Sequence, residues 1–129
     1  MSKRNLVLVD DETSLTKMLK LHLEDTGNYI VNEINDGRIA VGAIKEIKPD
    51  IVLLDLMMPD IHGEDIATEL LSDPFTSNIK IIFLSAKSLQ INDDTKHLRS
   101  ITLLKKPINI DSLLNAIDDM LKDIKQNII

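Results

Sequence analysis

The sequence predicts an α/β protein: a doubly wound, five-stranded parallel sheet with helices on both faces. Short apolar runs alternate along the chain with segments whose apolar residues recur at helical spacing. The runs are the predicted strands, and they cover residues 5–9, 30–34, 51–54, 80–84 and 101–104. Strands that alternate with helices favour parallel pairing, and right-handed crossovers distribute the helices over both faces of the sheet.

Each predicted helix shows one apolar stripe. The stripes are Leu15, Met18, Leu19 and Leu23; Ala40, Ala43, Ile44 and Ile47; Ile66, Ala67, Leu70 and Leu71; and Ile110, Leu113, Leu114, Ile117, Leu121 and Ile124. Gly27, Pro49 and Pro74 supply stop signals after the first three, and Asn109 is the expected N-cap of the last. The pattern over residues 89–99 is poor, so it indicates a further helix only weakly.

Composition limits the function classes. The 129 residues suit one domain, which we expect to cover residues 1–129, and 43% apolar with 28% charged residues is typical of a globular protein. A net charge of −6 without a basic cluster disfavours direct nucleic-acid binding. The absence of cysteine excludes disulfides and thiolate zinc sites. Without a signal peptide or a membrane-length apolar run, we expect a cytoplasmic protein with no membrane insertion.

Polar residues follow four of the predicted strands. Asp10 and Asp11 end the first apolar run, Asp55 ends the third, Ser85 follows the fourth and Lys106 lies just beyond the fifth. The carboxyl ends of parallel strands share one edge of the sheet, where ligands bind, and neighbouring strands lie about 4.8 Å apart. We therefore expect these residues to form one acidic site in which the carboxylates share a cation.

The residue types at this edge suit phosphoryl transfer. Carboxylates, a backbone carbonyl and waters are ligands that Mg²⁺ prefers, and the ion would offset the charge of an incoming phosphoryl group. The Lys106 ammonium and the Ser85 hydroxyl can bind phosphoryl oxygens. Asp55 is the candidate nucleophile, because a carboxylate can attack phosphorus and form an aspartyl phosphate.

Four segments carry a family pattern in order and at family-like spacing. They are Val-Asp-Asp-Glu at 9–12, the stretch 49–60 followed by Gly63, Phe-Leu-Ser-Ala-Lys at 83–87, and Lys-Lys-Pro at 105–107. Together they resemble the receiver domain of two-component response regulators over essentially the whole chain. The resemblance implies the flavodoxin-like strand order 2-1-3-4-5.

The resemblance also implies a function. Asp55 would take a phosphoryl group from a histidine kinase or a histidine phosphotransfer protein, and phosphorylation would change binding to a downstream protein effector. Ser85 would move towards the phosphate and Lys106 would pair with it, aimed inward by a cis peptide bond to Pro107. Such a domain is no enzyme beyond catalysing its own phosphorylation and dephosphorylation.

The same resemblance implies a metal site. Asp11, Asp55 and the backbone carbonyl of Met57 would coordinate Mg²⁺ (or Mn²⁺), and Asp10 would act mainly through water. The apolar Met57 side chain would be unable to orient an attacking water, so we expect it to affect the lifetime of the phosphoryl group. Leu103 occupies a place where receivers usually carry Tyr or Phe, which leaves an aromatic switch in doubt.

Alternatives remain open at this point. A phosphate-independent receiver-like interaction module is compatible with Leu103. An aspartyl-phosphate phosphatase would need a second Asp where Met57 stands, and it would need a cap insertion. The last stripe can pack wholly inside or leave a dimer edge, so both a monomer and a weak homodimer fit.

Overall fold

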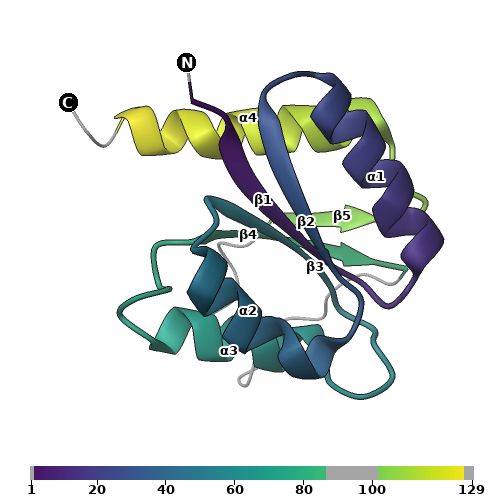
Figure 1. The fold of residues 1–129 in the computed structure, drawn as a ribbon, viewed down its shortest axis with the longest axis vertical. Coiled ribbons are helices and arrows are strands. Elements are labelled where there is room, and N and C mark those ends of the chain that lie inside the picture. Colours follow the sequence, from purple (N-terminus) through teal and green to yellow (C-terminus); the bar gives the residue numbers. More distant parts are fainter. Residues whose placement is uncertain (1, 87–101, 127–129) are drawn as a thin grey trace.

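A single parallel sheet forms the centre of the molecule (Figure 1). The computed structural model describes residues 2–86 and 102–126. Within them the strands are β1 (Arg4–Val9), β2 (Tyr29–Ile34), β3 (Ile51–Asp55), β4 (Lys80–Ser85) and β5 (Thr102–Lys105). All pairings are parallel and the order is β2-β1-β3-β4-β5, which confirms the predicted fold class and topology.

The helices follow the predicted stripes. They are α1 (Thr13–Asp25), a short 3₁₀ helix η1 (Gly37–Ile39), α2 (Ala40–Ile47), α3 (Gly63–Ser72) and α4 (Ile110–Gln126). Gly27, at φ 81°, follows the end of α1 in the left-handed conformation that glycine adopts readily. The Asn109 side chain accepts a 2.9 Å hydrogen bond from the backbone N–H of Ser112, which confirms the predicted cap of α4.

Among the stripe residues whose side chains the structure describes, which leaves out Ile124, one is misplaced. Met18 was expected on the buried face of α1, yet its side chain is 41% exposed, whereas Leu19 and Leu23 are fully buried. Thr16 takes part of that face instead and is also fully buried. The buried face of α1 is therefore rotated towards the side that carries Thr16. The weakly indicated helix at residues 89–99 lies outside the described residues.

Two apolar cores cover the two faces of the sheet. Alternate strand residues point to opposite faces, so Val52 and Leu54 of β3 face one core while Ile51 and Leu53 face the other. Helices α2 and α3 complete the first core, and α1 and α4 complete the second (Figure 1). The prediction of helices on both faces is thus confirmed.

The central strand, β3, is buried along its whole length. Every residue of β3 is buried, and the strand ends with Asp55, which is only 2% exposed. The carboxylate of Asp55 is therefore held at the end of a buried apolar strand.

Among the described residues, no helix combines the length and the apolar character needed to cross a bilayer.

Candidate functional site

Three carboxylates meet at the carboxyl edge of the sheet. Asp10 and Asp11 follow β1, and Asp55 ends the neighbouring strand β3. One oxygen of each lies within 4.8 Å of the others; Asp10 and Asp55 are buried and Asp11 is exposed. The predicted acid cluster therefore forms, with one side open to solvent.

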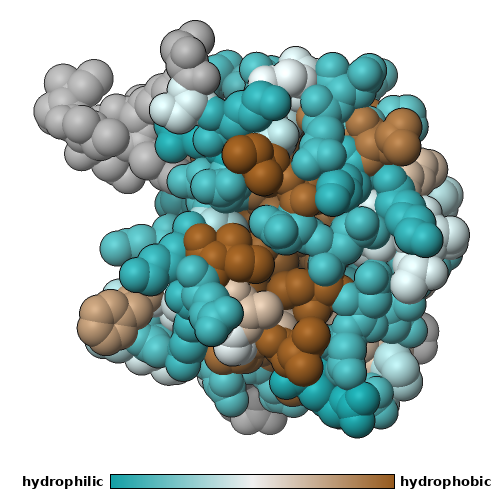
Figure 2. Space-filling view, viewed as in Figure 1, coloured by the Kyte–Doolittle hydropathy of each residue, from teal (hydrophilic) through white to brown (hydrophobic). Residues whose placement is uncertain are grey.

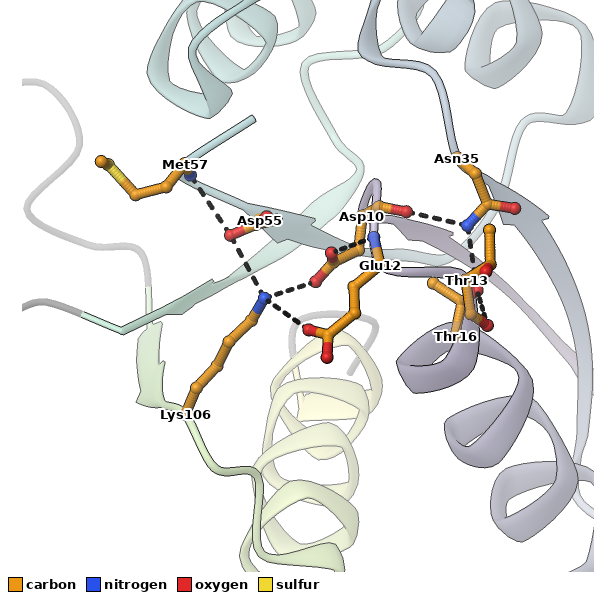
Figure 3. Close-up of polar contacts among 8 residues, drawn as sticks. All are labelled: Asp10, Glu12, Thr13, Thr16, Asn35, Asp55, Met57 and Lys106. Atoms are coloured by element: carbon orange, nitrogen blue, oxygen red, sulfur yellow. Dashed lines mark hydrogen bonds and ion pairs between the residues drawn. The ribbon is translucent and has the colours of Figure 1, made fainter. Parts of the chain in front are cut away.

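The Asp10 carboxylate is held on both of its oxygens. Oδ1 accepts a 2.9 Å hydrogen bond from the backbone N–H of Glu12, which fixes the turn between β1 and α1. Oδ2 is buried and is contacted by the side chain of Lys106. Its negative charge is balanced by the Nζ atom of Lys106, 2.8 Å away (Figure 3).

Among the residues that the structure describes, Lys106 supplies the positive charge of the site. It follows β5 and is joined to Pro107 by a cis peptide bond, as the resemblance implied, and its backbone N–H donates a 2.8 Å hydrogen bond to the carbonyl of Ser85. Its Nζ lies 3.6 Å from Oδ1 of Asp55 and 3.7 Å from Oε2 of Glu12, besides its contact with Asp10. Burial lowers its pKa, but Asp10 and the other acids raise it more, so the net shift is upward. Lys106 therefore stays protonated at neutral pH.

Asp55 lies in an environment that resists its ionisation. Burial raises the pKa of this carboxyl to about 6, and the negative charges of Asp10 and Asp11 add to the effect. A 3.2 Å hydrogen bond from the backbone N–H of Met57 to Oδ1 and the charge of Lys106 act in the opposite direction. A further positive charge would be needed to hold all three acids ionised at once.

Ser85 and Met57 lie beside this cluster. Ser85 ends β4 and is buried; the preceding residue, Leu84, pairs in register with Asp55. The Met57 side chain is 54% exposed and points away from the acids (Figure 3). Its backbone N–H contacts Asp55, while the role of its carbonyl as a metal ligand stays a prediction.

Two polar residues near the site were not predicted from the sequence. The Asn35 side-chain amide donates to the backbone carbonyl of Asp10 at 2.8 Å and to Oγ1 of Thr16 at 3.0 Å. The Thr16 hydroxyl in turn donates to Glu33 Oε1 at 2.8 Å. The sequence carries no signal for these contacts, because Thr16 lies outside the predicted apolar stripe and its burial is seen only in the structure.

The residues fit a hard divalent cation. Three carboxylates, each with an oxygen within 4.8 Å of the others, form an oxygen-rich donor set of the kind that Mg²⁺ takes. The exposed position of Asp11 leaves room for the waters that Mg²⁺ retains. No histidine takes part in the cluster formed by the described residues.

Comparison with known families identifies the chain. Residues 6–118 match the family described as the response regulator receiver domain. The chain belongs to this family. It is therefore a receiver domain of the two-component response regulator type, a signalling domain and not a conventional enzyme. Receiver domains bind Mg²⁺ at an acidic pocket, and Asp10, Asp11 and Asp55 form an acidic cluster in this chain.

Curated relatives of this receiver domain include proteins of different length. It is 42% identical over 91 residues to the chemotaxis protein CheY of Thermotoga maritima, covering 70% of this chain and 72% of CheY. It is 38% identical over 86 residues to the DNA-binding response regulator MtrA of Mycobacterium tuberculosis, covering 67% of this chain. The match spans only 36% of MtrA, so the receiver corresponds to about a third of that protein.

Solved structures agree with the receiver fold. The N-terminal domain of a response regulator receiver protein from Methanoculleus marisnigri is 28% identical, with a TM-score of 0.73, and the match covers 92% of this chain and 96% of that one. A CheY-like receiver domain protein from Methanospirillum hungatei has a TM-score of 0.85 over 98% of this chain and 99% of its own. At 21% identity the second comparison concerns the fold alone.

Proposed function

We propose that this receiver accepts a phosphoryl group on Asp55 from the phosphohistidine of a histidine kinase or a histidine phosphotransfer protein. One observation carries the proposal: a single ammonium, Lys106 Nζ, lies 2.8 Å from Asp10 and 3.6 Å from Asp55 at the open edge of the sheet. A carboxylate nucleophile, acids for a metal and a lysine for the transferred group are the parts that such a reaction needs.

The step forms one bond and breaks another. A carboxylate oxygen of Asp55 attacks phosphorus, the new P–O bond forms, and the P–N bond to the donor imidazole breaks. When bound, Mg²⁺ (or Mn²⁺) supplies the charge neutralisation that lets acids and phosphoryl oxygens lie together. Asp11, Asp55 and the Met57 carbonyl would hold the ion, and Asp10 would act mainly through water.

The surrounding residues then bind and orient the group. Lys106 pairs with a phosphoryl oxygen as a mobile point charge, and Ser85 donates its hydroxyl hydrogen to another. The Met57 side chain, directed outward and apolar, offers no hydrogen bond to an attacking water. We expect the phosphoryl group to be lost more slowly than it would be with a polar residue at this position.

Phosphorylation would act through protein partners. We propose that the phosphorylated form changes its binding to a downstream protein effector in the cytoplasm, as a monomer or a weak homodimer. A net charge of −6 argues against direct contact with nucleic acid by this chain. The names of the relatives point to DNA binding in one case and chemotaxis in another, so they do not specify the effector.

The proposal is tested by mass spectrometry of the intact protein. Incubation with acetyl phosphate and Mg²⁺ should add one phosphoryl group per chain, and Asp55→Asn should remove that addition. Asp60→Asn is the matched control, because Asp60 is an exposed aspartate in the next loop and lies outside the acid cluster. An unchanged wild-type mass would contradict the proposal and favour the phosphate-independent interaction module.

A further inference from the structure

Both backbone polar groups of Asp10 are hydrogen-bonded to residues at the end of β2 or directly after it. Its N–H donates to the carbonyl of Ile34 at 3.1 Å, and its own carbonyl accepts from the Asn35 side chain at 2.8 Å. Asp10 lies beyond β1, where the regular ladder with β2 has stopped at the pair Val9 and Ile34. These two bonds extend the strand pairing to the first acid of the site.

The Asn35 amide replaces a backbone donor. Continuing the β1–β2 register by one residue places Asp10 opposite Asn35, so a regular parallel ladder would supply the N–H of residue 36 to the Asp10 carbonyl. The backbone instead turns into η1, which Asp36 caps by accepting a hydrogen bond from the N–H of Arg38. A side-chain amide has the same donor chemistry as a peptide, so Asn35 completes the pairing.

The second hydrogen of the same amide reaches α1. Nδ2 of Asn35 lies 3.0 Å from Oγ1 of Thr16, which is fully buried in the first turns of the helix and donates onward to Glu33. A side-chain NH₂ group carries two donors, and here one is used on β1 and the other on α1. Figure 3 shows Asn35 between the Asp10 carbonyl and Thr16.

We propose that Asn35 is a positioning residue that fixes the Asp10–Glu12 turn in the arrangement that receives the divalent cation. The argument is geometric. Oδ1 of Asp10 is bound to the N–H of Glu12 inside the turn, so a shift of the Asp10 backbone moves its carboxylate, and Asp11 follows directly in the chain. This inference rests on the proposed metal site.

The test compares two asparagines of the same strand region. Asn35→Ala removes both donated hydrogen bonds, whereas Asn32→Ala is the matched control, because Asn32 is an exposed residue within β2. By calorimetry, the Mg²⁺ dissociation constant should rise about tenfold in Asn35→Ala, as is usual when a partner of a metal ligand is lost, and stay unchanged in Asn32→Ala. In metal-free protein, the Glu12 amide should exchange its hydrogen faster in Asn35→Ala only.

A second pair of variants guards against a folding defect. Thr16→Val removes the hydroxyl that accepts from Asn35 and should weaken Mg²⁺ binding by a smaller factor, while Thr16→Ser keeps the hydroxyl and should restore it. Equal Mg²⁺ affinity of folded Asn35→Ala and wild type would overturn the inference and leave the proposed function intact. Wild-type protein that binds no Mg²⁺ would overturn both.

Discussion

Lys106 offsets the repulsion between the carboxylates of Asp10 and Asp55. Two buried carboxylates face each other across the ends of β1 and β3, and the ammonium lies between them. Like charges at this separation would otherwise force one acid to take up a proton. The lysine lies on a different strand end from both acids, so the site forms only when the sheet is complete.

The perturbed pKa of Asp55 predicts how stability depends on pH in EDTA. The folded-state pKa of about 6 exceeds the ordinary value of 3.8, so between these pH values the native state binds more protons than the unfolded state. Stability from this group is therefore lost as pH rises through that window. Asp55→Asn should be more stable than wild type by about 1–3 kcal/mol at pH 7.5, and the difference should vanish towards pH 4.

Urea unfolding at several pH values measures this difference directly. Asp60→Asn, which changes an exposed acid, should follow the wild-type pH profile. A constant difference between Asp55→Asn and wild type across the range would mean that Asp55 is not the titrating group.

At the scale of residues, the sequence predicted which charged side chains meet, but it did not predict the residue that holds the backbone of Asp10. Asp10, Asp11, Asp55 and Lys106 follow apolar runs, and strand ends in a parallel sheet share an edge, so their proximity could be inferred. The amide of Asn35 bonds to a backbone carbonyl, and a contact of this kind leaves no periodic pattern in the sequence. It becomes visible only in the three-dimensional arrangement.

The start of α3 is packed directly against the acceptor strand. A Cβ atom added at Gly63 would overlap the backbone carbonyl of Asp55, and Gly63 donates its own N–H to the carbonyl of Leu56 at 3.2 Å. Only glycine lets the helix begin this close to the strand end. The first residue of α3 thus limits where the Asp55 backbone can lie.

Two glycines in helices should respond in opposite ways to alanine. Gly63→Ala requires the backbone at Asp55 to shift and should cost about 1–3 kcal/mol of unfolding free energy. Gly42→Ala in α2 meets nothing within 4 Å and should gain about 0.5–1 kcal/mol. Urea denaturation of both variants in EDTA checks the prediction, and equal effects would contradict the packing argument.

The helices were predictable where the spacing of apolar residues was the dominant signal. Leu19 and Leu23 repeat at helical spacing and are buried as expected, because this spacing places them on one side of α1. Met18 lies at the border of that stripe, where spacing alone does not tell an inward side chain from an outward one. The buried Thr16 shifted the real face away from it.

The whole molecule gains stability from any ion that binds only the folded state. The three acids lie at the ends of two strands that are distant in the sequence, β1 and β3, so the unfolded chain has no equivalent site. Saturating Mg²⁺ at 100 times its dissociation constant should stabilise the fold by about 2.7 kcal/mol. Thermal melting with Mg²⁺ or EDTA measures the effect, and Mn²⁺ should act in the same direction.

Asp11→Asn serves as the test of the metal assignment. The Asp11 side chain is exposed, so its replacement should leave the metal-free melting temperature nearly unchanged while abolishing the gain from Mg²⁺. A melting temperature of wild type that is indifferent to Mg²⁺ would refute the assignment. Asp60→Asn should keep the full gain.

The overall topology followed from alternation of strands and helices, and the strand order from the resemblance. Both could be anticipated because parallel crossovers admit few arrangements. Leu103, expected to break the family pattern, packs against the core shared by α2 and α3.

The lysine beside the acids has a consequence for how the chain folds. The Lys106 ammonium comes from a distant part of the chain and offsets part of the charge of Asp10 and Asp55. We therefore expect the chain to fold without a metal ion and to bind the ion afterwards.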